Sequence, residues 1–157
     1  MLQRGAAHVV ALDVGHGQFD WTLRNDPRVT VIEGFNARAL TPADLPNPMD
    51  LVTIDVSSIS LSKILPVLPP LLAPGADVVA LVKPQFEVGP DMVGSGGIVR
   101  DAAVRERAVG HVRLVCEENG FTVAGEIPSP VAGGDGNQEI LLHLRWSGKH
   151  PSQGTPF

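Results

Sequence analysis

Three charged side chains stand where apolar segments of the chain begin or end, and together they could do acid–base or charge-stabilising chemistry. Asp55 interrupts an apolar run, Lys83 closes another, and Glu139 opens a third. A lysine that ends a buried segment has to be solvated or paired with an acid. Two plainer interpretations stay open, a structural ion pair between Asp55 and Lys83 and a helix cap at Asp55, although serines just after Asp55 could provide that cap equally well.

The expected strands bring these three residues together. Asp55 and Lys83 end consecutive parallel strands, and neighbouring strands lie about 4.8 Å apart, so the two side chains can meet. Glu139 lies at the start of the last strand. If that strand runs antiparallel beside the strand of Lys83, its beginning reaches the same edge of the sheet, and an Asp–Lys–Glu cluster is complete.

A fourth acidic residue, Asp13, ends the first expected strand and is followed by the turn Gly15-His16-Gly17. Two glycines suggest half of a dinucleotide-binding fingerprint, with Glu33 near the place of a ribose-binding acid, but the third glycine is absent. The glycines could instead only permit a tight turn. A third interpretation is that Asp13 itself binds the hydroxyls of a ribose.

The elements that must position these residues follow from the spacing of apolar residues, which alternates between the periods of strands and helices. Helices are expected at 18–25, 60–72 and 102–119, the second one kinked or shortened by its prolines. A turn is expected at Pro74-Gly75, a glycine-rich loop at 84–100 and a tail at 147–157. Strands are expected at 8–14, 29–33, 50–57, 77–83, 121–127 and 138–146. This alternation predicts an α/β fold with a mainly parallel sheet and an antiparallel final pair.

The amino-acid composition excludes several classes of protein function. The chain has 157 residues, 43% of them hydrophobic, which is enough for a core and too much for a disordered protein. Its apolar runs are shorter than the roughly 20 residues of a membrane span. A single cysteine, Cys116, indicates a reducing, cytoplasmic setting, and the histidines have no metal-ligand spacing. A net charge of −5 means that any binding to nucleic acid is local or assisted by another domain.

Other features allow more than one interpretation. The glycines of segment 94–97 could cradle a phosphate through backbone N–H groups, or the segment could be a mobile lid. Cys116 lies on an apolar helical stripe, which favours core packing. The two tryptophans, Trp21 and Trp146, could stack on bases, but a core or edge position is the simpler expectation.

Five motifs carry a resemblance to a known family. They are LDVGHGQ at 12–18, DLVTIDVS at 50–57, LVKPQFE at 81–87, GGIVRD at 96–101 and NQEILL at 137–142. In this order and spacing, the sequence resembles the TlyA family, which is described both as haemolysin A and as FtsJ-like, S-adenosylmethionine-dependent ribosomal RNA 2′-O-methyltransferases. The resemblance implies a Rossmann-like class I methyltransferase sheet with an antiparallel last strand.

The resemblance also implies roles for single residues. The family's active site is a Lys-Asp-Lys-Glu tetrad, and Asp55, Lys83 and Glu139 match its last three positions. Asp13 is expected to bind the ribose of the methyl donor, Asn36 to lie near its adenine, and Asp55 to be close to the cofactor as well. The implied substrate is ribosomal RNA or a ribosomal subunit. Arginines expected to line the substrate side are Arg38, Arg100, Arg105 and Arg107.

Parts of the family pattern have no counterpart here, namely an S4-type RNA-binding domain, the first tetrad lysine, the opening strand and the glycine-rich cofactor loop. We therefore expect residues 1–146 to be a partial methyltransferase domain that lacks the central strand between the strands of Asp13 and Asp55. The alternatives are an inactive fragment or one half of a split protein that needs an N-terminal partner chain. A small NAD-binding oxidoreductase is the remaining alternative.

Overall fold

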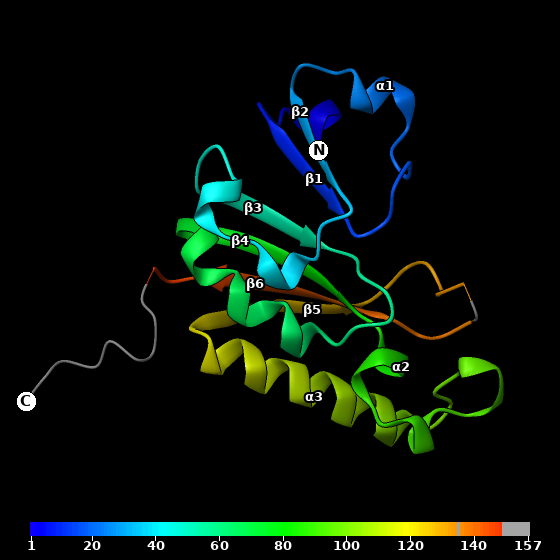
Figure 1. Ribbon diagram of the computed structural model, residues 1–157. Helices are drawn as coiled ribbons and strands as arrows, with labels where there is room; N and C mark the ends of the chain where they lie inside the picture. Colours follow the sequence, from blue (N-terminus) through cyan, green and yellow to red (C-terminus); the bar gives the residue numbers. More distant parts are fainter. Residues whose placement is uncertain (135, 149–157) are drawn as a thin grey trace, which may run out of the picture. The chain divides into compact units, whose positions relative to one another are not determined.

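The computed structural model describes residues 1–134 and 136–148, and the chain divides into two compact units (Figure 1). Unit 1 comprises Met1–Pro46 and unit 2 comprises Asn47–Phe157. The predicted tail at 147–157 lies outside the described residues from position 149 onward. No helix among the described residues is long and apolar enough to cross a membrane.

Unit 1 is a two-stranded parallel sheet with short helical turns. Strands β1 (Val9–Asp13) and β2 (Val29–Glu33) pair in parallel, and Asp13 stands opposite Glu33 at their carboxyl ends. The expected helix at 18–25 is reduced to α1 (Trp21–Arg24), because the Asp20 side chain accepts a hydrogen bond from the Thr22 amide at 2.8 Å and so caps the first turn. Three 3-10 turns complete the unit, at Leu2–Arg4, Ala37–Ala39 and Pro42–Asp44.

Unit 2 contains a four-stranded sheet in the order β3-β4-β6-β5. Its strands are β3 (Met49–Ile54), β4 (Leu72–Val82), β5 (Phe121–Pro128) and β6 (Ile140–Trp146). The β3–β4 pair is parallel, while β6 is antiparallel to both of its neighbours, which confirms the prediction for the last strand. The strands β1 and β3 belong to separate sheets.

The core of unit 2 lies between this sheet and α3 (Ala102–Glu118), which begins and ends within one residue of its predicted range (Figure 1). Alternate residues of β4 and β6 are buried against it, as the two-residue period of strands requires. Cys116 is fully buried in this core, and burial raises the pKa of its thiol to about 12. The rings of Phe121 and Trp146 pack 5.4 Å apart, whereas Trp21 in unit 1 is exposed.

Two predicted elements of unit 2 were wrong. The expected helix over 60–72 is a series of 3-10 turns at Leu61–Lys63, Leu65–Val67 and Pro69–Leu71, because its prolines cannot donate the hydrogen bonds of an α-helix. The expected turn at Pro74-Gly75 lies inside β4. There β4 makes an irregular excursion, since Met49 pairs with Leu72 while Leu51 pairs with Asp77, and Gly75 takes up a φ of 80°.

The glycine-rich connection after β4 has its own local structure. It contains α2 (Pro84–Glu87) and 3-10 turns at Pro90–Met92 and Ser95–Gly97. The amides of Gly94 and Gly97 donate to Ile98 and Gly94 within this connection. These two N–H groups are therefore occupied, which weakens the interpretation of the segment as a phosphate cradle.

Candidate functional site

The structure places Asp55 and Lys83 in contact at the carboxyl ends of β3 and β4. The Lys83 Nζ lies 2.8 Å from Asp55 Oδ1. The Lys83 side chain is only 17% exposed, whereas that of Asp55 is 71% exposed. Asp55 follows the last residue of β3, and Ser60, not Asp55, caps the next helical turn by accepting from the Ser62 amide. The carboxylate of Asp55 is therefore available to the lysine.

Glu139 lies at the same edge of the sheet. Val82 pairs with Ile140 in the antiparallel β4–β6 ladder, so extending this register by one residue sets Lys83 against Glu139. Side chains of directly opposed residues share one face of a sheet. Glu139 is 7% exposed, and its side chain has no ion pair or hydrogen bond in the described part of the chain. Its carboxylate oxygens are not fully enclosed, because Gln85 Oε1 is the one fully buried side-chain polar atom without a partner among the described residues. The strand register therefore places Glu139 beside Lys83, but no ion pair joins the two in the described part of the chain.

Glu87 in α2 links the two loops that carry Asp55 and Lys83. Its Oε1 accepts a hydrogen bond from the Leu61 amide at 2.8 Å, and its Oε2 accepts one from the Ser60 hydroxyl at 2.6 Å. These bonds tie the loop after β3 to the helix that follows Lys83. The sequence analysis quoted Glu87 within its motif without giving it a role, since nothing in the sequence pairs it with Ser60.

Asn137 joins the glycine-rich segment to the start of β6. It is 1% exposed, its Oδ1 accepts from the Val99 amide at 3.0 Å, and its Nδ2 donates to the Gly97 carbonyl at 2.9 Å. Arg105 holds the same segment from α3 by donating to the carbonyls of Val99 and Arg100 at 3.1 and 2.7 Å. The guanidinium of Arg105, expected on the substrate side, thus binds the protein's own backbone.

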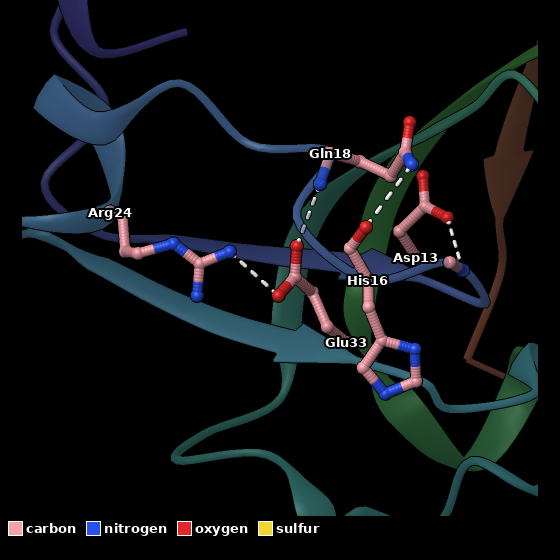
Figure 2. A network of polar contacts seen from close by, with 6 residues as sticks. Asp13, His16, Gln18, Arg24 and Glu33 are labelled. Carbon is pink, nitrogen blue, oxygen red and sulfur yellow. Dashed lines mark hydrogen bonds and ion pairs between the residues drawn. The ribbon is translucent and has the colours of Figure 1, made fainter.

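In unit 1, the turn after β1 is held by a network of polar contacts (Figure 2). The Gly15 amide donates to Asp13 Oδ1 at 2.7 Å, and the Gln18 amide donates to Glu33 Oε1 at 3.0 Å. Arg24 binds the other oxygen of Glu33 at 2.6 Å and so lowers the pKa of that carboxyl below its ordinary value. Glu33, the ribose-binding acid of the nicotinamide alternative, is therefore engaged with Arg24 and the turn.

Two side chains of this unit retain polar atoms that no bond recorded among the described residues uses. The Gly15 amide binds one carboxylate oxygen of Asp13, and in Figure 2 no dashed line reaches the other. The Asn36 Oδ1 accepts from the backbone amide and the guanidinium of Arg38, at 3.0 and 3.3 Å, which leaves its Nδ2 as a donor. Unit 1 can thus offer an acceptor at Asp13 and a donor at Asn36 to a ligand.

Chemically, unit 2 offers a lysine amine paired with Asp55, with Glu139 at the same edge of the sheet, and unit 1 offers an acid at the end of its first strand. No group of three His, Cys, Asp or Glu side chains among the described residues is placed to hold a metal ion. The fold is that of class I methyltransferases. A protein from Listeria monocytogenes described as an S-adenosylmethionine-dependent methyltransferase shares it, with a TM-score of 0.65 over 92% of this chain and 83% of that chain at 14% identity.

The chain belongs to the FtsJ-like methyltransferase family, whose model matches residues 1–146. It is 52% identical, over 145 residues, to the 16S/23S rRNA (cytidine-2′-O)-methyltransferase TlyA of Mycobacterium tuberculosis, covering 92% of this chain and 54% of that protein. A protein described as a hemolysin from Streptococcus thermophilus matches with a TM-score of 0.91 and 45% identity, over 94% of this chain and 54% of that one. These findings confirm the predicted TlyA resemblance, and the chain spans about half the length of these two relatives.

Proposed function

We propose that this chain carries the catalytic edge of an S-adenosylmethionine-dependent 2′-O-methyltransferase that acts on ribosomal RNA. The observation that carries the proposal is the partly buried Lys83 amine, which lies 2.8 Å from Asp55 Oδ1 at the sheet edge where β6 begins next to Glu139. The relatives named above support the reaction and the substrate class, because one of them is named for the same methylation. Membership of a methyltransferase family also speaks against the NAD-binding alternative.

Lys83 is the group that would meet the ribose 2′-hydroxyl. A hydroxyl is a poor nucleophile, so its proton has to be taken or polarised while the oxygen attacks the methyl carbon. Nζ of Lys83 would take or polarise that proton, with Asp55 and Glu139 holding the amine in place from two sides. The remaining help is alignment of the two reactants and stabilisation of developing charge.

The residues of unit 1 fit the cofactor that this reaction needs. When bound, S-adenosylmethionine supplies a methyl group on its sulfonium. Asp13 has one carboxylate oxygen fixed by Gly15 and one without a contact, which suits a ribose hydroxyl donor. Asn36 offers its Nδ2 as a donor to a ring nitrogen of an adenine.

Calorimetry tests the cofactor part of the proposal by comparing S-adenosylmethionine binding to the chain alone and to the chain mixed with the N-terminal half of the TlyA relative, of which this chain covers 54%. Binding in either sample supports a methyltransferase site on this chain. Binding only in the mixture assigns part of that site to the added half, and binding in neither counts against the proposal.

The proposed reaction is tested with radiolabelled S-adenosylmethionine and ribosomal subunits, with the modified nucleotide identified after nuclease digestion. Lys83→Ala should lower the rate of methyl transfer by a factor of about 100 to 10,000, while leaving the affinity for the cofactor nearly unchanged. Lys63→Ala is the matched control, because Lys63 is an exposed lysine of the same unit. Near-normal transfer by Lys83→Ala, or methylation of a base instead of a ribose, would refute the proposal.

A further inference from the structure

We propose that Gly133 is a positioning residue for Glu139, because only a residue without a side chain leaves room for the Glu139 carboxylate where the structure places it. The inference rests on the proposed function, since it explains how Glu139, one of the three proposed catalytic residues, is placed. Gly133 belongs to the loop between β5 and β6 and was not among the residues singled out from the sequence.

The contact between the two residues is close. A Cβ atom built on Gly133 would lie 2.7 Å from Oε1 of Glu139 and 3.0 Å from its Cδ. Real Cβ atoms essentially never approach other heavy atoms to less than 3.0 Å. The Glu139 carboxylate therefore lies against the bare Cα of Gly133, and any side chain at position 133 would occupy the same space.

The loop backbone is fixed on both sides of this contact. The Gly133 amide donates to the Asn137 carbonyl at 3.0 Å, and the Gly136 amide donates to the Gly133 carbonyl at 2.7 Å. The Ser129 amide donates to the Glu139 carbonyl at 2.8 Å. Asn137 is in turn bound through its side chain to Gly97 and Val99. Because the backbone is held at these points, the clash of an added methyl group with Glu139 is relieved at the lowest cost in free energy by movement of the Glu139 carboxylate.

The requirement at position 133 is steric and not conformational. Gly133 is not among the glycines with a left-handed backbone, so alanine can adopt its φ and ψ. Its neighbour Gly134 also has no left-handed φ, and a Cβ built there meets nothing within 4 Å. Gly134→Ala is therefore a matched control, whereas Gly136 is unsuitable because its φ is +85°.

The first test follows the carboxylate directly, without needing activity. In the full chain labelled with ¹³C at glutamate, the Cδ resonance of Glu139 is assigned by its loss in Glu139→Gln. We expect Gly133→Ala to move this resonance and Gly134→Ala to leave it in place. If neither variant moves it, or both move it equally, the inference is wrong.

The second test measures methyl transfer in whichever assembly transfers methyl groups. A misplacement of about 1 Å can cost about 100-fold in rate, so we expect Gly133→Ala to lower kcat by about 10- to 100-fold with KM values unchanged. Gly134→Ala should keep the wild-type kcat. A displaced resonance with an unchanged kcat would overturn the positioning role. Absence of transfer by the wild type would count against the proposed function instead, and the resonance would then decide the inference alone.

A third variant covers the possibility that Gly133→Ala fails to fold. The double variant Gly133→Ala/Glu139→Asp shortens the acid by one methylene group and makes room for the new methyl group. Where Gly133→Ala does not fold, we expect the double variant to fold, and failure of the double variant as well would show that the steric explanation is wrong. Where Gly133→Ala does fold, we expect the effects of the two changes on unfolding free energy to be non-additive, because the two residues share one contact, and simple additivity would contradict the explanation.

Discussion

The two units differ in what holds them together. Unit 2 contains every buried apolar side chain of the described chain, gathered between a four-stranded sheet and α3. Unit 1 has no fully buried residue between Met1 and Pro46, and its two strands form a sheet of their own. A two-stranded sheet is marginal in water, whereas a larger sheet packed against a helix is independently stable. The proposed catalytic residues thus lie on the firmer unit.

The two proposed roles, catalysis by unit 2 and cofactor binding by unit 1, therefore depend on different forces. In unit 2, apolar burial sets the strands whose ends bring Lys83 to Asp55. In unit 1, hydrogen bonds and the Arg24–Glu33 ion pair hold the turn that follows Asp13. Regions with few buried apolar contacts open locally at low free-energy cost, so we expect the proposed cofactor residues to be the more dynamic ones.

The largest expected effect is loss of core packing. Leu142→Ala in β6 should lower the free energy of unfolding by about 2 to 5 kcal/mol, because Leu142 is fully buried and leaves a cavity. Leu12→Ala in β1 should cost less than about 1.5 kcal/mol, since that side chain is only partly buried. Urea unfolding followed by Trp146 fluorescence in a Trp21→Phe background measures the loss in unit 2, and hydrogen exchange of the β1 and β2 amides measures the loss in unit 1. Equal losses would contradict the contrast between the units.

An intermediate effect is expected from Asn137→Ala, which leaves the Val99 amide and the Gly97 carbonyl without their partner. Burying unsatisfied polar groups costs about 1 to 3 kcal/mol, so unfolding free energy should fall by that amount. Gln138→Ala is the control, because Gln138 is exposed and its side chain donates only to the neighbouring carbonyl of Glu139, at 3.3 Å. A loss no larger for Asn137 than for Gln138 would show that the buried amide does not hold the segment.

The smallest effect concerns pH and unit 1. Hydrogen bonding to Arg24 lowers the pKa of Glu33 from its ordinary 4.5, so the pair stabilises the folded unit above that pH and loses its effect as pH falls through the folded-state pKa. Arg24→Gln should raise the pKa of Glu33 toward 4.5, measured by ¹³C NMR of the carboxyl group. Asp26, whose pKa Arg28 lowers to about 2, is the internal control and should not change. An unchanged pKa of Glu33 in Arg24→Gln would mean that the ion pair is absent in solution.

Much of the fold could be predicted from the sequence, because the spacing of apolar residues and the lengths of strands are local properties of the chain. The strand β2 matches its prediction residue for residue, and α3 nearly does. The segment around Pro66 and Pro69 shows the limit, since its apolar spacing indicates a helix while its prolines allow only 3-10 turns. The excursion at Gly75 was missed because a glycine after a proline signals a turn, whether the turn ends a strand or interrupts one.

The candidate site was predictable where it depends on strand ends. Asp55 and Lys83 were expected to meet because they end consecutive parallel strands, and the structure places them 2.8 Å apart. The residues that support them were not predictable. Glu87 reaches Ser60 across 27 positions of sequence, and such a pairing has no local signal. The close approach of Gly133 to Glu139 likewise depends on the path of a loop.

The sequence by itself determined which residue types stand at the ends of the strands, the direction of the final strand and the chemistry that an acid–lysine–acid set can perform. These follow from periodicity and from the cost of burying charge, which act within a few residues. Only the tertiary structure decided which polar groups are satisfied. It buried Asn137 between two loops, left Gln85 Oε1 as the one fully buried side-chain polar atom without a partner in the described part of the chain, and occupied Arg105 with backbone carbonyls. Hydrogen bonds have a short range and strict geometry, so they depend on which distant segments the packed core brings together.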